Sequence, residues 1–144
     1  MENKIQVNSV DFFEKKPVIE RIRMQVFVKE QGVPETLEMD DRDEICLHFL
    51  AFYDGLAVGT ARLDLGLHGK VGRLAVLYPY RGKNVGKSLM RFLHQSAWDR
   101  GLTEVWCHAQ LSAQGFYSQM GYTKAGSVFQ EAGIDHITMR CIKI

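Results

Sequence analysis

The sequence predicts an α/β domain built on one mixed sheet of about seven strands, with helices on both faces. Three successive apolar stretches between residues 45 and 77 are separated by glycine-bearing turns, as in an antiparallel meander. A helical apolar pattern at residues 85–100 then leads to another short apolar stretch, residues 104–109. Two strands joined by a long helix are parallel neighbours, so the expected sheet is mixed. We expect a single domain spanning residues 1–144.

The first third of the chain is expected to contain a strand, a helix and an acidic segment. Residues 5–8 alternate in polarity and predict the strand. An apolar face over residues 18–27 predicts the helix, with Pro17 in its first turn and Gly32 just beyond its end. Residues 35–44 hold six carboxylates. Such a run predicts either a solvated loop or an acidic wall that attracts a cationic substrate.

Turn residues place the remaining elements. Asp54-Gly55 is a strong hairpin signal between strands at residues 45–53 and 56–65. The next strand, at residues 73–77, leads into the glycine-bearing turn before the long helix. The C-terminal part is expected to add a short helix and a last hairpin, at residues 111–120, 127–130 and 134–142.

Composition narrows the classes of function. A net charge of +1, without a stripe of basic and aromatic residues, disfavours a nucleic-acid partner. No apolar run reaches the length of a membrane span, so no membrane partner is expected. Cys46, Cys107 and Cys141 lie far apart in apolar surroundings. They predict reduced, buried thiols in a cytoplasmic protein, and no metal site, because their spacing is not that of metal ligands.

The turn at residues 81–88 carries the strongest chemical signal. It follows a strand and opens a helix, and the free amides and positive dipole end of a helix N-terminus favour phosphate. The same turn carries three cations, Arg81, Lys83 and Lys87. A P-loop is disfavoured because three residues, rather than four, separate Gly82 from Gly86. The dinucleotide fingerprint G-x-G-x-x-G is also absent from this turn.

Two motifs make the chain resemble the GNAT family of N-acetyltransferases. Residues 81–86 are similar to the family's R/Q-x-x-G-x-G/A motif, with Asn84 at the middle glycine. Asparagine is among the residues that best tolerate positive φ, so this departure is mild. Residues 113–122 are similar to the family's A-x-x-F-Y-x-x-x-G-F motif, which is matched by Ala113, Phe116, Tyr117 and Gly121. The order of elements agrees over nearly the whole chain, and shorter segments resemble the small bacterial YjcF/ElaA-like subgroup.

The resemblance implies an acetyl-CoA-dependent N-acetyltransferase, in which a primary amine of a small molecule or peptide attacks the thioester directly. Strands 71–77 and 104–109 would part and hold the pantetheine like an extra strand, through the backbone of Leu74, Ala75 and Val76. The pyrophosphate would bind to the backbone amides of Gly82, Lys83, Asn84, Val85, Gly86 and Lys87, with Arg81 closing the turn. Tyr117 would protonate the leaving thiolate. Family members are often dimers, which leaves a homodimer open.

The general base is not identified by the resemblance. Many family members carry a glutamate beside the Leu-x-Val triplet, where this chain has Arg73. The candidates on the acceptor side are Glu38, Asp40, His108 and His136, and a water chain to solvent would also serve. The missing glutamate and Asn84 leave an alternative function open, a non-catalytic CoA-binding or regulatory module on the same fold.

Overall fold

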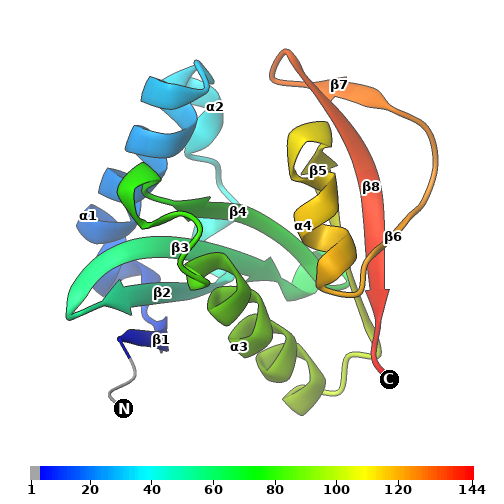
Figure 1. Ribbon diagram of the computed structural model, residues 1–144, viewed down its shortest axis with the longest axis horizontal. Coiled ribbons are helices and arrows are strands. Elements are labelled where there is room, and N and C mark those ends of the chain that lie inside the picture. Colours follow the sequence, from blue (N-terminus) through cyan, green and yellow to red (C-terminus); the bar gives the residue numbers. More distant parts are fainter. Residues whose placement is uncertain (1–3) are drawn as a thin grey trace.

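An eight-stranded mixed sheet organises the molecule (Figure 1). The computed structural model describes residues 4–144. The strand order is β1-β2-β3-β4-β5-β8-β6, and β7 pairs with β8 outside this path. The strands are β1 (Ile5–Val10), β2 (Leu47–Tyr53), β3 (Leu56–Asp64), β4 (Lys70–Val76), β5 (Glu104–Gln110), β6 (Thr123–Lys124), β7 (Phe129–Glu131) and β8 (Ile134–Ile142).

Helices cover both faces of the sheet, as the sequence predicts. The α-helices are α1 (Phe12–Arg23), α2 (Glu35–Glu38), α3 (Val85–Asp99) and α4 (Gln114–Gln119). A π-helix, η1 (Met24–Glu30), continues α1, and four 3₁₀ turns complete the set, η2 (Asp43–Ile45), η3 (Leu65–Leu67), η4 (Tyr78–Tyr80) and η5 (Leu111–Ala113). α1 packs against β3 and β4, whereas α3 lies across β1, β2 and β3 on the opposite face and α4 packs against β5 (Figure 1). No helix within residues 4–144 is long and apolar enough to cross a membrane.

Most of the predicted elements are confirmed. β2, β3 and β4 are consecutive antiparallel neighbours. Asp54 (φ 50°) and Gly55 (φ 86°) make the hairpin turn between β2 and β3 in left-handed conformations, as the Asp-Gly signal predicts. The prediction of about seven strands misses β6, because two residues leave no readable alternation.

The predicted start of the first helix is wrong. α1 begins at Phe12, after Asp11, whose carboxylate accepts a hydrogen bond from the amide of Glu14 at 2.9 Å. This cap supplies a start signal six residues before Pro17, which therefore lies inside the helix. The carbonyl that residue 17 would normally bond is that of Phe13, an exposed residue, so water can take the place of the missing amide.

β4 and β5 part after only two residue pairs. They are parallel, as predicted, but pair only at Lys70↔Trp106 and Val71↔Cys107. A bulge in β4 follows at once, because Gly72 faces Arg62 of β3 whereas Ala75 faces Thr60, so that two residues of β4 oppose one of β3. Arg73 in this bulge has a φ of 52°, which is rare for a residue other than glycine. The predicted splay between these strands is confirmed.

The acidic segment is not a solvated loop. It folds into α2 and η2, and the carboxylates of Glu38 and Asp43 are buried. Arg23 lies buried between them, with Nε donating to Glu38 at 2.7 Å and Nη1 donating to Asp43 at 2.9 Å. Arg62 extends this network, donating to Asp43 at 2.8 Å and to Asp40 at 2.7 Å. Buried charges require such partners, so the network fixes the acidic segment against β3.

Substitution of Arg23 tests this network. We expect Arg23→Met to lower the free energy of unfolding by about 3–5 kcal/mol, because two buried carboxylates lose their shared partner. Urea unfolding of the variant and the unaltered chain measures the difference. Lys16→Met is the control, since its surface ion pair with Glu20 at 3.8 Å should contribute less than about 0.5 kcal/mol. Equal losses in the two variants would contradict the structural role of Arg23.

Candidate active site

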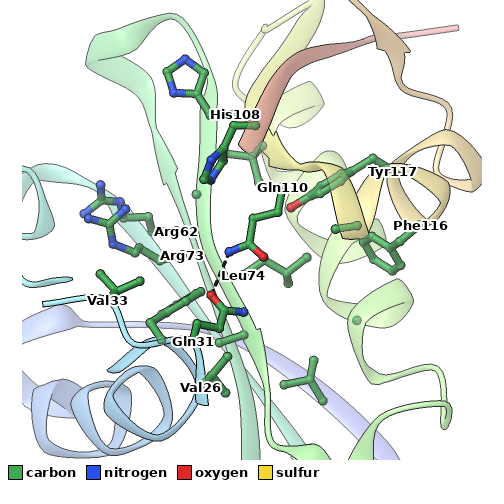
Figure 2. Close-up of a pocket in the computed structure, with 18 of the residues that line it drawn as sticks. Val26, Gln31, Val33, Arg62, Arg73, Leu74, His108, Gln110, Phe116 and Tyr117 are labelled. Atoms are coloured by element: carbon green, nitrogen blue, oxygen red, sulfur yellow. Dashed lines mark hydrogen bonds between the residues drawn. The ribbon is translucent and has the colours of Figure 1, made fainter. Parts of the chain in front are cut away.

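A cleft of about 960 Å³ opens where β4 and β5 part. η1 and α2 border it on one side, β7 and β8 border it on the other, and the first residues of α3 also line it. Figure 2 shows Arg62 and Arg73 on one wall and Tyr117 on the opposite wall, with His108 and Gln110 between them. The predicted site residues that line this cleft are Leu74, Ala75, Val76, Arg81, Gly82, Asn84, Val85, Gly86, Lys87, Tyr117, Glu38, Asp40, His108 and His136. Lys83 is the predicted site residue that does not line it.

The turn before α3 leaves its backbone amides open. Gly82 (φ 75°) and Asn84 (φ 70°) both adopt left-handed conformations, which the sequence allows at these two positions. The side chain of Asn84 does not cap the helix. The first amides of α3 have no acceptor within the helix, so they point their N–H groups at the end of the cleft. This arrangement suits an anion.

The cations of the turn divide into two kinds. Arg81 donates from Nε to the carbonyl of Val76 at 2.8 Å and pairs with Glu30 at 2.9 Å. It therefore ties the turn to β4 and η1, and its charge is compensated. Lys83 and Lys87 make no ion pair within residues 4–144, and the Lys83 ammonium lies 5.9 Å from the centre of the Tyr53 ring. Of these two, Lys87 lines the cleft and can face an anionic ligand.

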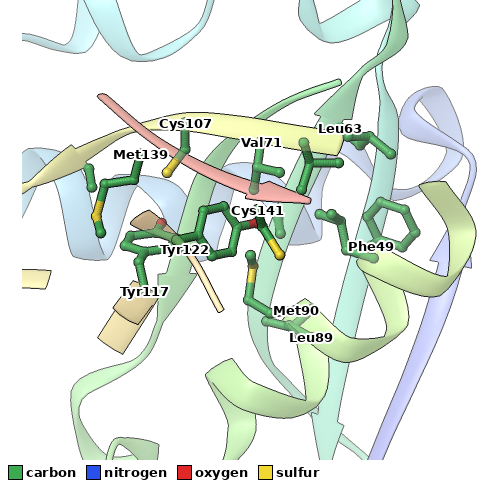
Figure 3. Packing of buried hydrophobic residues seen from close by; sticks show 14 of the residues in the cluster. Phe49, Leu63, Val71, Leu89, Met90, Cys107, Tyr117, Tyr122, Met139 and Cys141 are labelled. Carbon is green, nitrogen blue, oxygen red and sulfur yellow. The ribbon is translucent and has the colours of Figure 1, made fainter. Parts of the chain in front are cut away.

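Tyr117 lies on α4 with its ring in the core. It is 7% exposed, and its ring centroid is 5.3 Å from those of Phe116 and Tyr122. Figure 3 shows the ring beside Tyr122 and near Met139. Burial raises the pKa of the phenol well above its ordinary value, so it remains protonated at neutral pH. The hydroxyl makes no hydrogen bond in the described chain and is not sealed from solvent, so it can donate into the cleft.

Glu38 and Asp40 line the cleft as arginine-bound carboxylates. Glu38 pairs with Arg23 at 2.7 Å and with Arg73 at 3.4 Å. Asp40 pairs with Arg62 at 2.7 Å and with Arg73 at 3.2 Å. Although burial opposes it, the hydrogen bond and charge of Arg62, helped by Arg73, lower the pKa of Asp40 to about 2. A carboxylate with so low a pKa is a weak base at neutral pH.

Sequence reasoning missed Glu131, which brings the two candidate histidines together. Its Oε1 lies 3.0 Å from Nδ1 of His108, and its Oε2 lies 3.6 Å from Nε2 of His136. The ring of Phe129 packs 4.8 Å from that of His108 and 5.9 Å from that of His136. No sequence signal marked Glu131, because it is a single carboxylate beside a hairpin turn.

A second missed feature crosses the cleft. The side-chain amide of Gln110, at the end of β5, donates to Oε1 of Gln31 at 2.8 Å (Figure 2). Gln31 directly follows η1, so this bond joins segments that are 79 residues apart. Both residues line the cleft, so the bond links two of its sides.

Comparison with known proteins assigns the chain to a family. A model of the acetyltransferase (GNAT) domain matches residues 5–143. The chain belongs to the GNAT acetyltransferase family. Among GNAT relatives, the uncharacterized N-acetyltransferase YjcF of Bacillus subtilis is 36% identical over 122 residues, which cover 82% of this chain and 86% of YjcF. ElaA of Escherichia coli is 33% identical over 125 residues, which cover 83% of this chain and 82% of ElaA. The resemblance inferred from sequence is confirmed.

Solved GNAT structures share the fold. The crystal structure of Escherichia coli ElaA has a TM-score of 0.85 at 26% identity and covers 94% of this chain and 99% of its own. An acyl-CoA N-acyltransferase from Pseudomonas aeruginosa has a TM-score of 0.84 at 28% identity, with coverages of 95% and 99%. A GNAT acetyltransferase from Elizabethkingia anophelis with acetyl-CoA bound has a TM-score of 0.74 at 13% identity, with coverages of 98% and 99%. This last likeness is one of fold.

Gly86 allows α4 to approach the start of α3, and alanine substitution tests this contact. A Cβ at Gly86 would lie 3.3 Å from the ring of Phe116, whereas one at Gly115 would meet nothing within 4 Å. Both glycines are the second residue of their helix. We expect Gly86→Ala to lower the free energy of unfolding by roughly 1–2 kcal/mol through overpacking. Gly115→Ala should be neutral or stabilising by up to about 1 kcal/mol. Thermal unfolding measures both, and equal stability of the two variants would contradict the close contact.

Proposed function

We propose that this GNAT protein transfers the acetyl group of acetyl-CoA to a primary amine of a small molecule or a peptide. The observation that carries the proposal is the arrangement of three features in one cleft. The parted strands β4 and β5 lead from the open amides of α3 to the protonated hydroxyl of Tyr117. Family membership and the acetyl-CoA bound to the Elizabethkingia anophelis neighbour support the choice of donor.

The residues of the cleft fit the parts of acetyl-CoA. Beyond the Val71↔Cys107 pair, the edge of β4 toward β5 has no strand partner. Its backbone at residues 74–76 can therefore bond an extended pantetheine, as a sheet edge bonds a peptide, except at the Val76 carbonyl, which already accepts from Arg81 at 2.8 Å. The amides of residues 82–87 and the ammonium of Lys87 suit the pyrophosphate. Gly82 has open space at its Cβ position, so the ligand can approach the backbone there.

The chain then supplies proton transfer at the reacting centre. The nitrogen of the acceptor forms a bond to the carbonyl carbon as the carbon–sulfur bond breaks. Tyr117 donates its proton to the leaving sulfur. The raised pKa of the phenol keeps this proton on Tyr117 at neutral pH until the transfer. The acceptor nitrogen must lose protons, and the titratable candidates that line the cleft are Glu38 and Asp40 on the side of η1 and α2, and His108 and His136 on the opposite side.

A non-catalytic CoA-binding module is the alternative function. Arg73 stands where many family members carry a glutamate, and it donates to the Glu38 carbonyl at 3.1 Å and to Asp40 at 3.2 Å. This arrangement supplies no free carboxylate at the bulge. Calorimetry with acetyl-CoA and thiol release with a panel of amines separate the two functions. Tight binding without turnover of any amine would favour the module.

Lys87 tests the donor site. We expect Lys87→Gln to weaken acetyl-CoA binding by roughly five- to tenfold, about 1–1.4 kcal/mol, because one charge-assisted contact to phosphate is lost. Isothermal titration calorimetry measures the change. Lys124→Gln removes the same charge from an exposed position on β6 and should leave the affinity unchanged. A Lys87→Gln affinity equal to that of Lys124→Gln would argue against the pyrophosphate site.

Tyr117 tests the chemical step. We expect Tyr117→Phe to lower kcat by roughly 10²–10⁴-fold, the usual contribution of a placed proton donor, with acetyl-CoA affinity unchanged. Tyr122→Phe is the matched control, since its hydroxyl contacts Nε2 of His94 at 2.7 Å, away from the cleft. That control should lose about 1–2 kcal/mol of stability but keep its kcat. An unchanged kcat in Tyr117→Phe would remove the donor role from this residue.

A further inference from the structure

We infer that His108 is the proton acceptor of the reaction and that Glu131 positions it, so that the cleft takes its acceptor as an alkylammonium ion. The inference rests on the proposed acetyl transfer and assigns its acceptor half. It follows from the position of one carboxylate between two imidazoles at the side of the cleft opposite η1 and α2.

The hydrogen bonds determine the tautomers. An ionised carboxylate only accepts hydrogen bonds, so Nδ1 of His108, 3.0 Å from Oε1 of Glu131, carries a proton. A neutral His108 then keeps its lone pair on Nε2, the nitrogen that can take a proton from an acceptor. Nδ1 of His136 lies 2.7 Å from the carbonyl of Ile134, which also only accepts, so Nδ1 carries a proton there too. The side chain of His136 is 8% exposed and that of His108 is 26% exposed, so His108 is the imidazole open to an acceptor.

The distribution of charge in the cleft also favours His108 and Glu131 as the acceptor site. The other cleft-lining carboxylates each lie within hydrogen-bond distance of an arginine, in the pairs Glu38–Arg23, Asp40–Arg62 and Asp64–Arg42, all at 2.7 Å. Glu131 has only the two histidines as ionic partners in the chain from residue 4 onward. Glu131 therefore brings to the cleft a carboxylate that no arginine compensates. An ammonium ion is favoured there, and a primary alkylamine, with a pKa of about 10, is mostly an ammonium ion at neutral pH.

The other charged groups near His108 form no ion pair with Glu131 in the part of the chain that the structure describes. Trp106, two residues earlier on β5, packs its ring 5.4 Å from that of His108. The Lys70 ammonium lies 5.3 Å from the centre of the Trp106 ring, in a cation–π contact. Arg73 lies in the cleft, but its guanidinium is bonded to Asp40 and to the carbonyl of Glu38.

The proton steps balance. One proton of the ammonium passes to Nε2 of His108 and from there to water through the open cleft. The freed lone pair forms the carbon–nitrogen bond as the carbon–sulfur bond breaks. The second nitrogen proton follows the same route, while the sulfur takes a proton from Tyr117, which water replaces. Glu131 stays ionised throughout and stabilises each imidazolium, so it acts as a positioning residue.

Two variants and one matched control test the pair. We expect His108→Ala to lower kcat by roughly 10²–10⁴-fold without changing acetyl-CoA affinity, and imidazole in the buffer to restore part of the loss. Glu131→Gln should lower kcat by about 10–100-fold and raise the KM of the amine. Glu104→Gln makes the same substitution at a carboxylate that is 45% exposed, compared with 47% for Glu131, and that pairs with Arg140 outside the cleft. It should leave both constants unchanged.

Thiol release with an amine panel gives the kinetic constants, and calorimetry gives acetyl-CoA affinity. A second readout is independent of turnover: ¹⁵N NMR of labelled histidine should show His108 protonated at Nδ1, and Glu131→Gln should shift this signal. This inference alone is overturned if the unaltered chain turns over an amine and His108→Ala keeps the same kcat. It is also overturned if the kcat of His108→Ala falls and imidazole does not restore it. Acetyl-CoA binding with no turnover of any amine by the unaltered chain overturns the proposed function and this inference with it.

Discussion

The early parting of β4 and β5 is the constraint on which the rest of the molecule depends. Two parallel pairs hold the strands together, and beyond them the facing backbone of each strand has no ladder partner. Buried amides and carbonyls are rarely left unpaired, so these edges require water or a strand-like ligand. The bulge at Arg73 lies where the separation begins. Strand pairing thus creates the cleft, and the positive φ at Arg73 lies at its edge, in the bulge of β4.

The buried arginine network maintains one wall of this cleft. Arg23 is fully buried in the last turn of α1, and Arg62 and Arg73 reach the same carboxylates from β3 and β4. A guanidinium offers five donors in a fixed geometry, so each arginine joins several acceptors. As a consequence Asp40, whose pKa the arginines lower to about 2, is a weak base, whereas burial raises the pKa of Glu38 and leaves it bound to Arg23. Three carboxylates of the acidic segment, Glu38, Asp40 and Asp43, are thus part of a structural network with arginines.

Sequence reasoning succeeded where the relevant residues are close along the chain. The turn at residues 81–86, its tolerance of Asn84 and the segment around Tyr117 are local patterns, and the structure places them in one cleft. Residue pairs that are distant in sequence and meet only in the fold could not be predicted from the sequence. Arg62 and Asp40 are 22 residues apart, and Gln31 and Gln110 are 79 apart. Glu131 meets His108 only because β8 pairs with both β5 and β7, and strand order leaves no signal at a single carboxylate. Pro17 is a poor start signal for the first helix, because Asp11 caps this helix six residues earlier.

The two groups that we propose to transfer protons, Tyr117 and His108, lie in different surroundings. Burial raises the pKa of Tyr117, so the phenol always holds its proton, but the tyrosinate that donation leaves is costly in the same apolar surroundings. A thiolate, with a reference pKa near 8.5, is the weaker base of the pair, so complete transfer to sulfur is uphill unless the phenol is refilled at once. The hydroxyl is open to the cleft, which supplies the water that such refilling requires. In the proposed reaction, protons are removed where a cation is stabilised. Two of the candidate bases, His108 and His136, lie beside Glu131, a carboxylate that has no arginine partner within residues 4–144, and His108 is the more exposed of the two.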